Sequence, residues 1–194
     1  MKSKLLNRSM SGYAVVFTGL AFIVGVGAAR ADVKLEVTNT TYELRGLSLH
    51  AIDVDLHRVA EKDSDGIIEG ELKDDFNWTF KFVETADACR VTSDDIMLKL
   101  NMLLPRWADE EHADPALRTA WKAYIDDLKA HEDGHKTIAV DAAEKISRLT
   151  HGATALGSCD ALKRSLNSAA SQIVEAAEKA QEQLDAKDEP VALE

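Results

Sequence analysis

The sequence predicts an α+β fold in which a small, mostly antiparallel sheet is followed by a long helical hairpin. Three observations support this prediction. Within residues 33–102, several segments alternate apolar and polar residues, which is the period of half-buried strands. Residues 117–149 and 162–184 instead repeat apolar residues every three or four positions, as amphipathic helices do. Between them, residues 150–158 contain two glycines, which predicts the turn of the hairpin.

The strands come first along the chain. Residues 33–37 and 42–44 predict two short strands that end at Gly46, and residues 78–82 and 96–102 predict two longer ones. Their alternating residues are Val33, Leu35, Val37, Tyr42, Leu44, Trp78, Phe80, Phe82, Ile96, Leu98, Leu100 and Met102.

A short helix separates the two pairs of strands. Ser48 is a good N-cap, because its hydroxyl can accept a hydrogen bond from the first turn. The apolar face of this helix contains Leu49, Ile52, Leu56 and Val59. Residues 63–70 predict a loop. Residues 104–107 end the last strand, and residues 108–114 form an acidic loop before the long helix.

The long helix begins at Pro115, since proline is favoured at the first helical position. One apolar stripe runs along it, made by Leu117, Trp121, Tyr124, Leu128, His131, His135, Ile138, Ala142, Ile146 and Leu149. Both histidines lie on this stripe, which argues against a simple surface role. Buried imidazoles need partners for their ring nitrogens. A metal ion is one such partner, and hydrogen bonds in the core are the alternative.

The last helix has a stripe rich in alanine, made by Leu162, Leu166, Ala169, Ile173, Ala177, Ala180 and Leu184. Small residues suit close antiparallel packing on the preceding helix or a short coiled coil. Residues 160–185 are therefore also a candidate surface for self-association or for a partner. Residues 186–194 are expected to fray.

The stripe contains the pattern His131-Glu132-Asp133-Gly134-His135, an HExxH motif. Positions i and i+4 share one helix face, so both imidazoles can converge on one Zn²⁺. Glu132 lies one residue along, off that face, where it can accept a proton from water bound to the metal. Glycine is unfavourable within a helix, so Gly134 indicates the close approach of another segment or of substrate.

Catalytic zinc sites usually have a third protein ligand besides water. Asp185 and His151 are the candidates. Asp185 is favoured, because an antiparallel last helix returns residue 185 toward the histidines. His151 follows the long helix in a glycine-containing turn that could fold back, and the alternative is that it is a solvent-exposed loop histidine. Glu144 points away from the motif on a continuous helix. His50 and His57, in the short helix, are assigned surface or packing roles.

Residues 1–31 predict a secretory signal peptide with a basic start, an apolar centre and an Ala29-Arg30-Ala31 cleavage site. An uncleaved membrane anchor is the alternative, but glycines interrupt the apolar run, so no stable anchor is expected after cleavage. The remaining chain has 19 basic and 34 acidic residues, a net charge of −15, which disfavours nucleic-acid binding. Cys89 and Cys159 are the only cysteines, and an oxidising compartment favours a disulfide between them.

The chain also resembles a bacterial family, called domain of unknown function 922 and described as predicted secreted zinc-dependent proteases. The resemblance rests on Tyr42, Gly46, Asn77-Trp78, Cys89, Leu104-Pro105-Arg106-Trp107, Trp121, Tyr124, Leu128, His131-Glu132, Gly134-His135 and Cys159. It implies that His131 and His135 are zinc ligands, that Glu132 is the catalytic carboxylate, and that the compartment is the bacterial periplasm or exterior. Asp185 aligns with a C-terminal family pattern, but residues 184–189 lack the histidine found there in other members.

The leading hypothesis is therefore a zincin-type, secreted or periplasmic zinc hydrolase that cleaves peptide or protein substrates. The first alternative is a catalytically weak or inactive periplasmic binding or adaptor protein that retains the fold, with or without the metal, and the missing histidine favours it. The second is a structural zinc site, which needs four protein ligands and leaves no position for water.

Overall fold

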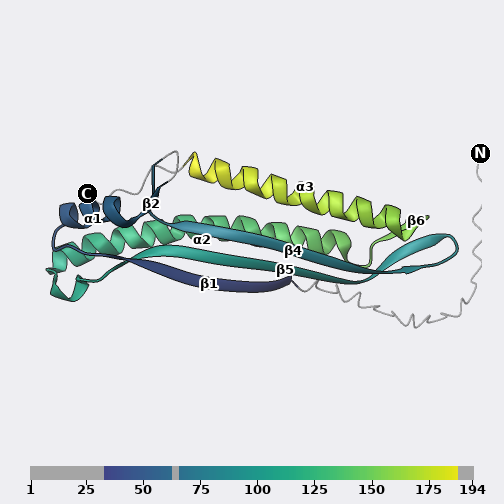
Figure 1. Cartoon of the computed structure of the whole chain (residues 1–194), viewed down its shortest axis with the longest axis horizontal. Coiled ribbons are helices and arrows are strands. Elements are labelled where there is room, and N and C mark those ends of the chain that lie inside the picture. Colours follow the sequence, from purple (N-terminus) through teal and green to yellow (C-terminus); the bar gives the residue numbers. More distant parts are fainter. Residues whose placement is uncertain (1–32, 63–65, 188–194) are drawn as a thin grey trace, which may run out of the picture. The chain divides into compact units, whose positions relative to one another are not determined.

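The computed structural model describes residues 33–62 and 66–187 (Figure 1). The expected signal peptide and the tail beyond residue 187 lie outside the described residues. Within the described part, the chain is α+β, with a mixed sheet and three α-helices.

The sheet is organised around one long strand, β5 (Ala88–Trp107). It pairs antiparallel with β4 (Glu71–Glu84) and β6 (Thr154–Leu156), and parallel with β1 (Val33–Leu44). The order β1-β5-β4 leaves β1 and β4 on the two sides of β5. Two of these three pairings are antiparallel, and the parallel pairing of β1 makes the predicted, mostly antiparallel sheet a mixed one.

The two short strands predicted near the start are one strand, β1. Its twelve residues pair with β5 in a single register from Val33 opposite Ile96 to Leu44 opposite Trp107. The residues joining the two predicted pieces contain no glycine or proline that would break a strand. Thr40 instead donates a side-chain hydrogen bond to Asn101 of β5, at 3.2 Å, which supports the pairing there.

Two helices pack on the apolar face of the sheet (Figure 1). They are α2 (Pro115–Thr150) and α3 (Cys159–Asp185). The core between sheet and helices contains Leu72, Ile96, Leu98, Leu100, Met102, Ala139, Ala143, Ile146 and Ala170. Ala139 and Ala143 of α2 and Ala170 of α3 are fully buried in this core. None of the described helices is long and apolar enough to cross a membrane.

Helix α1 (Leu49–Val59) begins at Ser48, whose hydroxyl accepts a hydrogen bond from the Ala51 amide at 3.1 Å. The predicted cap is confirmed. The segment predicted as a loop at 63–70 includes β3 (Ile67–Ile68), which pairs with β2 (Glu61–Lys62). A short 3₁₀ turn, η1 (Glu110–His112), precedes α2.

The turn from β1 into α1 requires a glycine at position 46. Its φ of +147° is rarely adopted by other residues, and an added Cβ would lie 2.8 Å from the Ala51 backbone. The Gly46 carbonyl accepts a hydrogen bond from the Trp107 indole at 2.9 Å, and its amide donates to Asp109 at 2.9 Å. This contact joins two of the residues on which the family resemblance rests.

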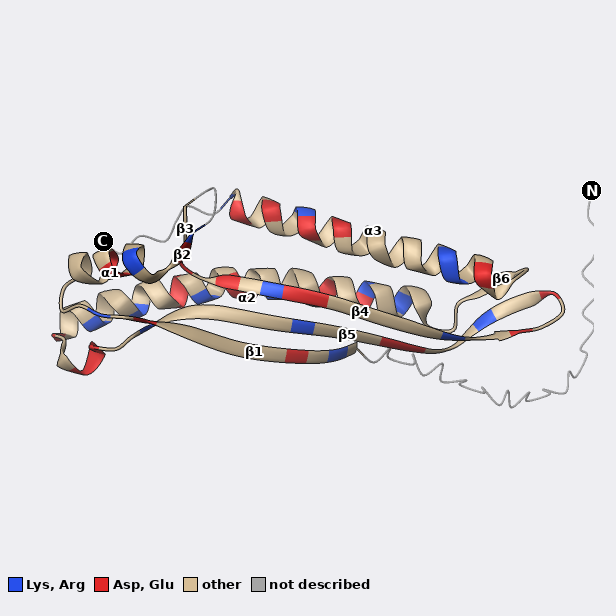
Figure 2. Ribbon diagram, viewed as in Figure 1, with Lys and Arg blue, Asp and Glu red and all other residues tan. Residues whose placement is uncertain are grey.

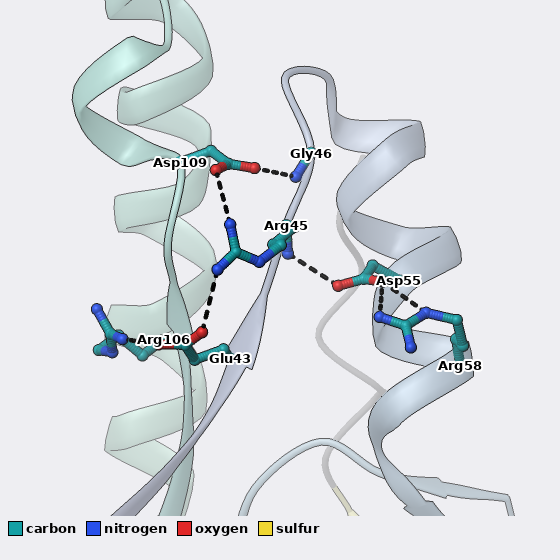
Figure 3. A network of polar contacts seen from close by, with 7 residues as sticks. All are labelled: Glu43, Arg45, Gly46, Asp55, Arg58, Arg106 and Asp109. Carbon is teal, nitrogen blue, oxygen red and sulfur yellow. Dashed lines mark hydrogen bonds and ion pairs between the residues drawn. The ribbon is translucent and has the colours of Figure 1, made fainter.

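An ion-pair network surrounds this turn (Figure 3). Arg45 pairs with Asp109 at 3.6 Å and with Glu43 at 3.4 Å, and its amide donates to Asp55 at 2.9 Å. Burial alone would raise the pKa of Asp55. Hydrogen bonds from Arg58 and from the Arg45 amide instead hold it below its usual value. The network fixes α1 against the end of β1.

The predicted disulfide between Cys89 and Cys159 is formed. It joins the first turn of α3 to the start of β5, where Cys89 is buried with Val91, Leu162 and Leu166. One end of α3 is thereby attached covalently to the sheet.

Candidate metal centre

Helix α2 places the two motif histidines side by side. It is continuous over 36 residues and begins as predicted, with Pro115 first and Asp114 accepting a hydrogen bond from the Leu117 amide at 2.9 Å. His131 and His135 are one turn apart, and their Nε2 atoms lie 3.0 Å from each other.

Helix α3 brings Asp185 to the same point. One carboxylate oxygen of Asp185 lies 3.2 Å from His131 Nε2 and 2.8 Å from His135 Nε2. Among the described residues, His131, His135 and Asp185 form a group of three side chains that could hold a metal ion. Tetrahedral zinc with bonds of 2.0–2.1 Å needs ligand atoms about 3.3 Å apart. The observed separations differ from that by a few tenths of an ångström, so the three residues fit such an ion.

The other candidate histidines lie elsewhere. His151 is at the C-terminal end of α2, about 24 Å along the helix from His135. Its Nδ1 is 3.2 Å from Asp94, so the structure does not bring it to the motif. His57 pairs with Asp53 on the exposed face of α1, and His50 is exposed. The arrangement thus contains Asp185 and not His151.

Glu132 faces the sheet, whereas the two histidines face α3. Its side chain is 3% exposed, more deeply buried than that of His131. The sequence predicted it to lie off the buried face of α2. The difference arises because α2 is covered on two sides, by the sheet and by α3, so a wider arc of the helix is buried.

The segment leading into β4 covers Glu132. A Cβ added at Gly70 would lie 2.9 Å from Glu132 Oε1, and the Leu72 amide donates a hydrogen bond to the carboxylate. The second oxygen, Oε2, is buried and has no hydrogen-bond partner within the described part of the structure. A buried polar atom without a partner is unfavourable for stability, and a catalytic role or a bound ion or water is among the explanations for such an atom. Sequence reasoning did not find this segment, since Gly70 was its only signal.

Burial raises the pKa of the Glu132 carboxyl to about 7. Among the smaller contributions to this value, the charge of His131 lowers the pKa, the charges of Asp185 and Glu71 raise it, and the hydrogen bond from the Leu72 amide lowers it. A carboxyl that titrates near neutral pH can accept a proton and return it, as a general acid and base must.

The raised pKa also predicts how the stability of the metal-free protein depends on pH. Between the ordinary value of 4.5 and about 7, Glu132 keeps its proton when folded but loses it when unfolded. The free energy of unfolding therefore falls as pH rises through this window. We expect Glu132→Gln to match the wild type near pH 4 and to exceed it by up to about 3 kcal/mol near pH 8. Urea unfolding in EDTA measures this, and parallel pH profiles would contradict it.

Two tyrosines hold the segment that covers Glu132. The Tyr42 hydroxyl donates to the backbone carbonyl of Glu69 at 2.7 Å, and the Tyr124 hydroxyl donates to its carboxylate at 2.7 Å. Burial raises the pKa of Glu69, although the bond from Tyr124 opposes this. Both tyrosines occur in the motifs of the resemblance. Their contacts indicate that they position residues 69–72 beside the candidate metal centre.

Gly134 allows α3 to approach α2. A Cβ at this position would lie 2.9 Å from a methyl group of Leu184, the residue before Asp185. The close approach predicted from this glycine is thus made by α3. It brings the backbone of α3 near enough for Asp185 to reach the histidines.

The fold and site define an α+β protein with a His-His-Asp group beside a buried glutamate. The chain belongs to the family described as bacterial protein of unknown function (DUF922), whose model matches residues 39–190. No curated protein and no solved structure matches the chain significantly.

Proposed function

We propose that this protein is an exported zinc-dependent hydrolase that cleaves peptide bonds in peptide or protein substrates. The observation that carries the proposal is the convergence of His131, His135 and Asp185 next to the buried carboxyl of Glu132. When bound, Zn²⁺ would polarise a substrate carbonyl and lower the pKa of a coordinated water.

Each residue has a distinct part in this proposal. His131, His135 and Asp185 would hold the ion, and three ligands leave a fourth position open, unlike the closed shell of a structural site. Glu132 would accept a proton from the attacking water and pass it to the leaving amine. The sheet would exclude bulk water from this carboxylate, which keeps its pKa raised.

Export to the periplasm or the exterior is part of the proposal. The Cys89–Cys159 disulfide supports it, because disulfides persist in oxidising compartments. The N-terminal pattern of a signal peptide is consistent with it.

A second candidate function is a binding or adaptor protein without catalytic activity. The low exposure of Glu132 and of His135, at 3% and 7%, favours it, because substrate must reach both residues for hydrolysis. A hydrolase cleaves the peptide that it binds and an adaptor does not, whereas both functions are compatible with bound metal.

Zinc binding by defined variants tests the metal centre. We expect one zinc per chain in the exported protein, and at least about tenfold weaker zinc binding for Asp185→Ala, since even residues that only support ligands have effects of this size. His151→Ala is the matched control and should bind like the wild type. Calorimetry with zinc alone measures the affinities. Equal affinity of the Asp185 variant and the wild type would remove Asp185 from the site.

A further inference from the structure

The two ends of α3 are held in different ways. At its start, the disulfide and the buried Leu162 and Leu166 attach it to the sheet. In its middle, Asn167 accepts a hydrogen bond from the Trp78 indole at 2.8 Å, and Ala170 is fully buried. Ala177 is the last buried residue of the helix. In the following eight residues, 178–185, Ala180, Gln181 and Leu184 are half-buried and the others are exposed.

The end segment, residues 178–185, contacts the rest of the described protein through Gln181, Leu184 and Asp185. Gln181 donates a hydrogen bond to Asp74 of β4 at 2.7 Å. Leu184 packs against Gly134, where a side chain would collide with it. Asp185, the last residue of α3, meets the two histidines, although its side chain is 58% exposed. The contacts of Leu184 and Asp185 thus lie at the proposed metal centre.

The charges of the last turn destabilise the C-terminal end of α3. The C-terminus of a helix carries partial negative charge, which acidic side chains destabilise and basic ones stabilise. The last turn of α3 contains Glu182 and Asp185 and no basic residue. Figure 2 shows acidic residues recurring along this half of the helix. A cation held by Asp185 would offset this charge at the point where it accumulates.

We propose that the end segment of α3 is a latch that metal binding closes. With metal bound, residues 178–185 dock on α2 and complete the site. Without metal, they separate from α2 while the rest of α3 stays attached through the disulfide and the core. Asp185 is then both a ligand and the closing element, so the site is complete only when the ion is present. The latch rests on the proposed metal centre and describes its regulation.

The coupling is reciprocal. If closing the end segment strengthens metal binding, metal binding must stabilise the closed segment by the same factor. Local opening is reported by backbone amide exchange, and a segment held by few buried contacts opens separately from the core. Amide exchange along α3 therefore distinguishes a local latch from general stabilisation of the fold.

The experiment is hydrogen exchange with mass spectrometry on the exported, disulfide-bonded protein, with zinc or with EDTA. We expect zinc to slow exchange at least about tenfold in residues 178–185 and to leave residues 162–170 unchanged. Asp185→Ala, at a zinc concentration where calorimetry shows it occupied, should lose this slowing. Glu175→Ala, an exposed acid on the same helix outside the end segment, should retain it.

Each other outcome overturns the latch in a distinguishable way. If zinc binds but exchange in residues 178–185 is unchanged, the latch is wrong and the metal centre stands. Equal slowing along all of α3 means that zinc only stabilises the whole fold. Slowing in Asp185→Ala as in the wild type removes Asp185 as the closing element. Failure of the wild type to bind zinc rejects the latch together with the proposed function.

Discussion

Glu132→Gln should lower the kcat/KM for peptide hydrolysis by about 10²–10⁴-fold while leaving zinc content unchanged. The amide is nearly the same size as the carboxyl, so it fits between α2 and the segment at Gly70 and keeps the Leu72 amide within reach. It cannot accept a proton from water. The loss therefore isolates proton transfer from metal binding and from folding.

The measurement compares cleavage of a quenched fluorescent peptide library by zinc-loaded wild type and variant. His151→Ala is the control and should be fully active, because His151 pairs with Asp94 far from the motif. A zinc-loaded Glu132→Gln protein with wild-type activity would show that Glu132 is not the base. A zinc-loaded wild type that cleaves no member of the library would favour the binding or adaptor function.

The helical part of the site was predictable because helical geometry links sequence spacing directly to position. A period of 3.6 residues puts His131 and His135 on one face, and Pro115 fixes where α2 begins. An antiparallel hairpin of known turn position then returns Asp185 to the histidines. His151 competed with it in the sequence because it lies sixteen residues after His135, in a glycine-containing turn that could fold back. On a rigid helix, that separation places it far from the motif instead.

The sheet was less predictable, because alternation identifies the buried face of a strand but neither its partner nor its direction. The sequence therefore did not reveal that β1 is one strand running parallel to β5. The cover over Glu132 was missed for a related reason. It comes from residues 69–72, which precede α2 by more than forty positions and carry no periodic signal. Contacts between Tyr42, Tyr124 and Glu69 position it, and these are visible only in three dimensions.

Reducing the Cys89–Cys159 disulfide should lower the free energy of unfolding by about 4 kcal/mol, since the bond closes a loop spanning 70 residues. Within the folded protein, reduction should loosen α3 most, because the bond lies at its first residue and attaches it to β5. Without the bond, Leu162 and Leu166 still pack on the sheet, but the helix loses its only covalent attachment there.

Urea unfolding of the wild type with and without reductant, both in EDTA, measures this difference with identical side chains in the two states. A Cys89→Ala, Cys159→Ala variant is the matched control: it should be as unstable as the reduced protein or slightly more so, and reductant should not change it. Equal stability of the oxidised and reduced wild type would contradict the prediction. Because α3 carries Asp185 at its other end, the reduced protein should also bind zinc more weakly than the oxidised protein.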